Sequence, residues 1–144
     1  MNLYTIGFTK KSAKHFFELL KKNQVKCLID TRLNNKSQLA GFAKKDDLEY
    51  FLGVLAGIKY VYKPEFAPSD EILNKYKKGS MSWQEYEEKY LRLLEQRNIL
   101  KGLDFSFFEN ACFLCSEHSA EHCHRRLLAE YLKQHNPSLK IIHL

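Results

Sequence analysis

The stretch LYTIGFTKKSAKHFFELLKKNQVKCLIDTR, residues 3–32, has the pattern of one strand–helix–strand unit. Apolar residues 3–6 predict a short strand, which Gly7 ends. Ser12 can cap the helix that follows, because its side-chain oxygen can accept a free backbone N–H of the first turn. Apolar side chains three and four residues apart predict the helix itself: Ala13, Phe16, Phe17 and Leu20. Residues 25–29 form a second apolar run, and about thirty residues is the size of one β-α-β unit.

Helices and strands continue to alternate along the rest of the chain. Further strands are predicted at 58–62, 111–116 and 140–144, and helices at 46–56, between Pro68 and Gly79, behind a Ser82-x-x-Glu85 capping box, and at 123–134. A stripe on the helix after Ser82 predicts core packing rather than a platform for stacking bases: Trp83, Tyr86, Tyr90, Leu93, Leu94 and Arg97. The alternation predicts an α/β fold, a single Rossmann-like domain over 1–144 with a mainly parallel sheet of about five strands and helices on both faces. It does not determine the order of the strands.

Length and composition exclude several classes of protein. The 144 residues suit one domain, and ten Phe, eight Tyr and one Trp can fill a core, which excludes disorder. No apolar run approaches the roughly 18 residues of a membrane span. The first seven residues lack the features of a signal peptide, so we expect a cytoplasmic protein, where four cysteines argue against a disulfide framework. The net charge of +6 favours a polyanionic partner or a phosphorylated substrate. Alternatively, the charge belongs to a lysine-rich surface that is simply solvated.

Polar and reactive residues gather where the predicted strands end. In an open parallel sheet, ligands bind beyond the carboxyl ends of the strands. Thr9 follows the first strand, Asp30 and Arg32 follow the second, and Cys115 and Glu117 end the fourth. We therefore expect the functional site at this edge of the sheet.

Side chains alternate along a strand, and this separates the two cysteines of the fourth strand. Cys115 and Glu117 share one face, whereas Cys112 lies on the other face and is predicted to be a small buried residue. The two sulfurs then point apart, which argues against a zinc knuckle. On the second strand, Asp30 and Arg32 also share a face. They form either a structural ion pair, or a catalytic or ribose-binding carboxylate beside an anion-binding arginine.

The segment Cys123-His124-Arg125 opens the last predicted helix. A helix N-terminus stabilises a bound phosphate and lowers the pKa of a cysteine, so Cys123 is a candidate nucleophile, with His124 and Arg125 as candidate anion-binding residues. Alternatively, Cys115, Cys123 and one of three histidines hold zinc with an open position for water: His118, His122 or His124. A third interpretation is that Cys123 caps the helix and packs. Glu117 is either a buried general acid or base, or a structural partner of Arg125.

Several short motifs, taken in order, resemble one known family. They are Tyr4-Thr5-Ile6-Gly7, Ile29-Asp30-Thr31-Arg32, Ser37 with Gly41-Phe42-Ala43-Lys44, Cys115-x-Glu117 with Cys123-His124-Arg125, and the closing Ile142-His143-Leu144. Together they resemble the proteins grouped as domain of unknown function 488, over nearly the whole chain. The resemblance implies the fold, and a site at Asp30, Arg32, Cys115, Glu117, Cys123, His124 and Arg125, and it leaves the reaction open.

These residues lead to one functional hypothesis and two alternatives. We expect an enzyme that acts on a nucleotide or a nucleic-acid-related phosphorylated substrate, with four catalytic candidates: Glu117, Cys123, Asp30 and Cys115. The candidates for binding the substrate's anionic group are Arg32, His124, Arg125, Thr9 and Ser37. The alternatives are a non-catalytic nucleic-acid-binding module and a zinc-dependent hydrolase whose ligands are Cys115, Cys123 and His124.

Overall fold

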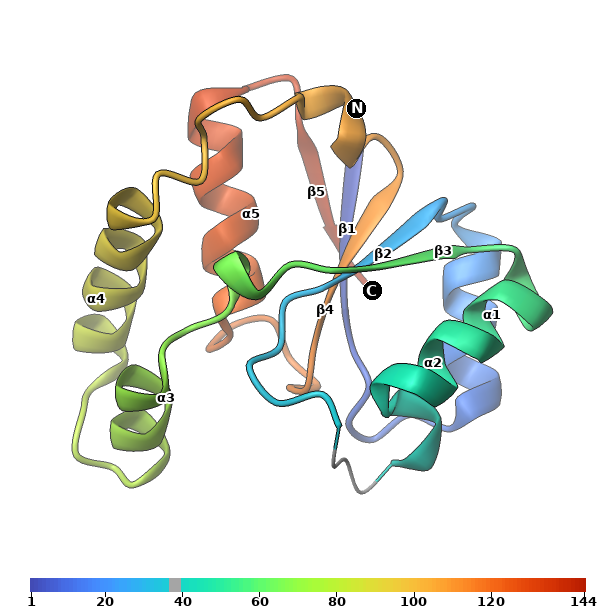
Figure 1. The fold of residues 1–144 in the computed structure, drawn as a ribbon, viewed down its shortest axis with the longest axis horizontal. Coiled ribbons are helices and arrows are strands. Elements are labelled where there is room, and N and C mark those ends of the chain that lie inside the picture. The colour runs from blue at the N-terminus through green and yellow to red at the C-terminus, as the bar shows by residue number, and fades with distance from the viewer. Residues whose placement is uncertain (37–39) are drawn as a thin grey trace.

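A sheet of five parallel strands lies at the centre of the protein (Figure 1). The structure is a computed structural model that describes residues 1–36 and 40–144. The strands are β1 (Asn2–Gly7), β2 (Cys27–Asp30), β3 (Lys59–Tyr62), β4 (Ala111–Cys115) and β5 (Lys140–His143). They lie in the order β3-β2-β4-β1-β5, and each neighbouring pair is parallel. β4 is therefore the central strand, and its carboxyl end lies between those of β1 and β2.

Helices cover both faces of this sheet. On one face lie α1 (Ala13–Lys22) and α2 (Lys45–Phe51); on the other lie α3 (Asp70–Lys77), α4 (Trp83–Gln96) and α5 (His124–His135), as Figure 1 shows. The predicted α/β, Rossmann-like class with five strands and helices on both faces is confirmed. None of the described helices is long and apolar enough to cross a membrane.

Serine residues cap the helices at the predicted positions. The Ser12 side chain accepts a hydrogen bond from the His15 N–H at 3.1 Å, and Ser82 accepts one from the Glu85 N–H at 3.1 Å. Each bond satisfies a backbone donor that has no partner within the helix, so both helices start where the sequence indicates.

The segment predicted as one helix over 46–56 consists of an α-helix followed by a π-helix. α2 ends at Phe51, and a π-helical stretch follows over Leu52–Ala56. Gly57 stops it, as predicted, with a φ of 64° that glycine adopts without steric cost. Three short 3-10 helices were not predicted, at residues 41–43, 64–66 and 105–108.

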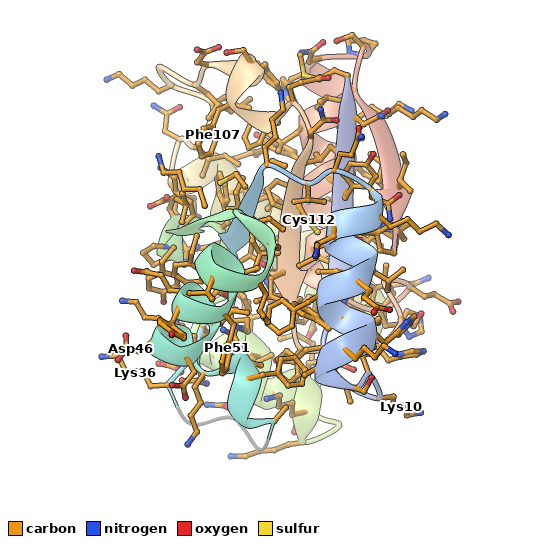
Figure 2. All side chains as sticks on the ribbon, turned by 90° about the vertical axis from the view of Figure 1, so that its right-hand side faces the viewer. Lys10, Lys36, Asp46, Phe51, Phe107 and Cys112 are labelled. Carbon is orange, nitrogen blue, oxygen red and sulfur yellow. The ribbon has the colours of Figure 1, made fainter. Side chains whose placement is uncertain are left out.

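Successive side chains of β4 enter two separate hydrophobic cores. Phe113 belongs to the core beneath α4 and α5, with Tyr90 and Leu128. Cys112 is fully buried in the core beneath α1, with Phe16, and Figure 2 labels it between α1 and α2. The prediction of a small buried residue on the face opposite Cys115 is confirmed, and burial raises the pKa of the Cys112 thiol.

Candidate active site

A pocket of about 1120 Å³ opens at the carboxyl ends of β2, β3 and β4. Its walls include Arg32 beyond β2, Tyr62 at the end of β3, and Cys115 at the end of β4. Cys123 and His124, at the start of α5, line the same pocket. Several residues that the sequence analysis selected are therefore brought together at the expected edge of the sheet.

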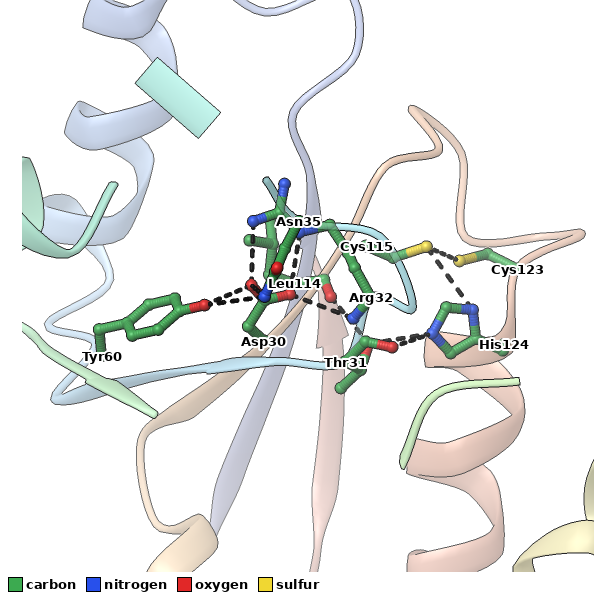
Figure 3. Close-up of polar contacts among 9 residues, drawn as sticks. All are labelled: Asp30, Thr31, Arg32, Asn35, Tyr60, Leu114, Cys115, Cys123 and His124. Atoms are coloured by element: carbon green, nitrogen blue, oxygen red, sulfur yellow. Dashed lines mark hydrogen bonds and ion pairs between the residues drawn. The ribbon is translucent and has the colours of Figure 1, made fainter. Parts of the chain in front are cut away.

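Two thiols and an imidazole form a cluster on the pocket wall (Figure 3). The Cys123 thiol donates a hydrogen bond to the Cys115 sulfur across 2.8 Å, and His124 Nδ1 lies 3.7 Å from that sulfur. The three side chains are all buried. Cys115 is thus the acceptor of the pair, because the second thiol and the imidazole both face its sulfur.

The orientation of His124 is fixed from behind by Thr31. His124 Nε2 lies 2.8 Å from the Thr31 carbonyl oxygen, and the Thr31 hydroxyl contacts the same nitrogen at 3.1 Å. A carbonyl oxygen can only accept, so we assign the ring proton to Nε2. Nδ1, the other ring nitrogen, then faces the Cys115 sulfur, and it donates to that sulfur when His124 carries both ring protons as an imidazolium.

These contacts favour a thiolate at Cys115. The hydrogen bond from Cys123, together with the nearby His124, holds the pKa of the Cys115 thiol well below its usual range, although burial opposes this effect. Burial and the bond to Cys115 raise the pKa of the Cys123 thiol. For His124, burial lowers the pKa, but the Cys115 charge, the contact with the Cys115 sulfur and the hydrogen bond to Thr31 together outweigh burial, so the pKa is raised. The geometry therefore favours Cys115 over Cys123 as the nucleophile.

The same cluster is the ligand set of the alternative metal site. The ligand atoms of Cys115, Cys123 and His124 lie within 4.8 Å of one another. Two thiolates on one tetrahedral zinc ion would lie about 3.7 Å apart, given Zn–S bonds of about 2.3 Å. The two sulfurs lie 2.8 Å apart, so they would have to separate by about 0.9 Å to hold one zinc ion together. The other histidines considered for such a site are not part of this cluster: His118 bonds the Thr9 carbonyl, and His122, which lines the same pocket, packs on Trp83.

Asp30 holds Arg32 in a fixed position beside the cluster (Figure 3). Arg32 Nε and Nη2 each donate to the fully buried carboxylate at 2.9 Å, and the Arg32 backbone N–H donates at 3.1 Å. Tyr60 and Asn35 add hydrogen bonds to the same carboxylate at 2.5 and 3.3 Å. Because all of these donors surround Asp30, the geometry favours the structural ion pair over catalysis by its carboxylate.

The third nitrogen of the Arg32 side chain has no such partner. Arg32 is 2% exposed, and its Nη1 is buried without a hydrogen-bond acceptor among the described residues. A buried donor without a partner costs about 1–3 kcal/mol, and more when it is charged. Since Arg32 lines the pocket, an anionic ligand there can supply the missing acceptor.

Arg125 is fully buried and does not line the pocket. Its Nη1 donates to the Glu117 carbonyl oxygen at 2.7 Å, its Nη2 donates to the His118 carbonyl oxygen at 3.2 Å, and its Nε donates to the Thr5 hydroxyl at 3.3 Å. Nη1 also lies 3.5 Å from the Cys123 sulfur. The geometry therefore favours a positioning role, in which Arg125 fixes the loop after β4 behind Cys123.

The expectation of a buried Glu117 side chain was wrong. Glu117 is exposed, because its segment leaves the sheet after Cys115, and it lines the pocket. The contact with Arg125 that the sequence suggested is made by the Glu117 backbone oxygen instead. This oxygen lies so close to Gly7 that a Cβ there would approach it to 1.6 Å. Only glycine fits at that position.

Two further candidates and two missed residues complete the site. Thr9 lies next to Ser116, which lines the pocket, and its hydroxyl donates to the Ser116 carbonyl oxygen. Thr9 itself is not among the lining residues. Ser37 lies outside the described residues. Sequence reasoning missed Tyr60 and Asn35, because their role depends on neighbours in space and no motif marks it.

The fold and the site together define an α/β parallel-sheet protein with a buried thiol cluster at the carboxyl edge of its sheet. The chain belongs to the family described as domain of unknown function DUF488, whose model matches residues 12–132. Comparisons with curated proteins and with solved structures gave no match. Family membership thus agrees with the resemblance seen in the sequence motifs, and it assigns no reaction.

Proposed function

We propose that this protein is an enzyme that acts on a nucleotide or nucleic-acid-related phosphorylated substrate, with Cys115 as its nucleophile. One observation carries the proposal: Cys115 and Arg32 line the same pocket. The Cys115 sulfur accepts a hydrogen bond from Cys123, and the buried Nη1 of Arg32 has no acceptor among the residues that the structure describes. A nucleophile and an anion-binding group in one pocket are what covalent catalysis on an anionic substrate requires.

The charge around the pocket supports an anionic substrate. Four cationic side chains line it, namely Arg32, Lys36, Lys45 and Lys77, whereas Glu117 is the acidic side chain among its described lining residues. This excess of positive charge attracts phosphate and stabilises negative charge that develops during a reaction.

Each polar residue then has a distinct task. Cys115 attacks the electrophilic atom of the substrate, so that a bond from its sulfur forms as the bond to the leaving group breaks. Glu117, which lines the same pocket, transfers the proton that the leaving group needs. His124 and Cys123 are positioning residues, because they act through the Cys115 sulfur.

Alkylation with iodoacetamide tests the thiolate assignment. We expect Cys115 to react fast near pH 6, where an ordinary thiol is almost fully protonated. Mass spectrometry after limited labelling identifies the modified residue. Cys112→Ser is the matched control, since Cys112 lies on the same strand but is buried on the opposite face. Labelling of Cys115 no faster than that of a free thiol would contradict the proposal.

Two further measurements test the alternatives. About one zinc per purified chain, lost in Cys123→Ala, would replace the thiolate proposal by the zinc-dependent hydrolase. Salt-dependent binding of nucleic acid that is unchanged in Cys115→Ser and Glu117→Gln, together with an ordinary Cys115 thiol, would instead favour the non-catalytic binding module.

A further inference from the structure

We infer that the pocket binds a nucleoside monophosphate, with the phosphate at Arg32 and the base against an aromatic wall formed by Tyr76, Trp83 and Tyr86. This inference rests on the proposed function and adds the substrate class. The inference rests on two parts of one pocket wall. One is Arg32, which follows β2, and the other is a group of aromatic rings on α3 and α4.

The phosphate side is already organised before any ligand binds. Two nitrogens of Arg32 are held by Asp30 at 2.9 Å, so the direction of its free Nη1 is fixed. Lys45 lines the same pocket, with its Nζ 5.4 Å from the centre of the Tyr62 ring. A fixed guanidinium nitrogen with a nearby lysine matches a phosphate group better than a neutral polar group.

The aromatic wall comes from α3 and α4. The rings of Trp83 and Tyr86 are stacked, with centroids 5.0 Å apart and planes 17° apart, and Tyr76 packs against both at 5.6 and 5.1 Å. Tyr86 is buried in the core, as the sequence predicted, but Trp83 and Tyr76 are only partly buried. The three rings also line the pocket. Aromatic rings of this kind can stack on a planar base whatever its identity.

The space between the two sides suits a whole nucleotide. A volume of about 1120 Å³ is at the upper end of small-molecule pockets, so phosphate, sugar and base fit together. Cys115 lies on the wall of this same pocket. Inorganic phosphate alone would leave the aromatic side unused, and a nucleoside alone would leave Arg32 without its acceptor.

Trp83 is the single tryptophan of the chain, so its fluorescence reports directly on the aromatic wall. We would titrate the full chain with adenosine 5′-monophosphate, ribose 5-phosphate, adenosine and inorganic phosphate, and follow both Trp83 emission and heat by calorimetry. We expect the nucleotide to bind most tightly and to change Trp83 emission. Ribose 5-phosphate should bind about tenfold or more weakly, the effect of losing one stacked base, and should leave the emission nearly unchanged.

Variants separate the two sides of the pocket. Arg32→Gln should weaken nucleotide binding about ten- to hundredfold, as expected for a lost charge-assisted hydrogen bond. Because this change also disturbs Asp30, Lys45→Ala gives a second test, with an expected loss of about two- to fivefold. Trp83→Leu should weaken nucleotide binding but not phosphate binding. Lys133→Ala is the control, since this exposed lysine of α5 does not line the pocket.

The possible results have different consequences. Equal binding of ribose 5-phosphate and the nucleotide, with no change in Trp83 emission, would overturn the inference and leave the proposed thiol enzyme intact. Nucleotide binding that depends on Arg32 and Trp83 would support the inference even if Cys115 proved unreactive, which would refute only the proposed function. Preference for a short single-stranded oligonucleotide over the mononucleotide would overturn the choice of a free nucleotide.

Discussion

Replacing Cys123 by alanine should change the reactivity of Cys115 in a direction that depends on pH. The substitution removes the thiol that donates to the Cys115 sulfur at 2.8 Å, which is the main reason for the low pKa of Cys115. A hydrogen bond to a charged group contributes about 1.5–3 kcal/mol, so its loss reduces the ionisation of the Cys115 thiol about ten- to hundredfold. His124 remains in place and keeps part of the effect.

The rate of attack changes less than the ionisation. A more basic thiolate is a better nucleophile, and with a Brønsted coefficient of about 0.5 the intrinsic rate rises about three- to tenfold. The net result is a reaction about three- to tenfold slower at pH values where the thiol is mostly protonated, and faster by a similar factor where it is fully ionised. The two pH profiles should therefore cross.

Stopped-flow reaction of the reduced protein with an aromatic disulfide reagent, from pH 5 to 10, measures both profiles. Cys123→Ser retains a donor and should give an intermediate curve. Cys112→Ala, on the opposite face of β4, should leave the reactivity of Cys115 as it is. Superimposable profiles for the parent protein and Cys123→Ala would refute the hydrogen-bond argument.

Three further predictions concern stability. Gly7→Ala should sharply reduce thermal stability and Cys115 reactivity, because its Cβ would lie 1.6 Å from a backbone oxygen, whereas Gly53→Ala, with no atom within 4 Å, should preserve both. Burial and the hydrogen bond to Asp30 raise the pKa of the Tyr60 phenol, so the folded state keeps a proton that the unfolded chain loses above pH ~10. The free energy of unfolding should then fall with rising pH by up to about 1.4 kcal/mol per pH unit, and urea titrations of Tyr60→Phe should lack this component. Arg125→Met should lower the free energy of unfolding by about 3 kcal/mol or more, because two loop carbonyls lose their buried donor at about 1–3 kcal/mol each; unchanged stability in urea would argue against its positioning role.

Local patterns were enough to predict most elements of the fold. The capping serines Ser12 and Ser82 act through the first turn of their own helices, so sequence alone reveals them. The alternation of side chains along a strand is also a local property, so the sequence alone placed Cys112 and Cys115 on opposite faces of β4. Strand order was not predictable, because the insertion of β4 between β1 and β2 depends on contacts between residues far apart in the chain.

The edge of the sheet at which the pocket opens was predictable, but the contacts of the residues there were not. Arg32 and Arg125 are both arginines after or near strand ends. Arg32 lines the pocket and has a nitrogen without an acceptor among the described residues, whereas Arg125 is fully buried and donates to two loop carbonyls. Similarly, the position of Cys123 at a helix N-terminus suggested that it ionises, whereas the Cys115 sulfur is the acceptor. Such differences arise from distances of a few ångströms, which sequence spacing does not encode.

The central position of β4 has a consequence for how the chain matures on the ribosome. β1 and β2 are made first, but β4, the strand that lies between them, begins only at Ala111. Until then, the nascent chain has two strands without their shared neighbour, and it resembles an incomplete folding intermediate with open strand edges. Cys115 and Cys123 emerge later still. The contact between the two sulfurs therefore cannot form before residue 123 has been made, so a shorter nascent chain lacks the arrangement that we propose to activate Cys115.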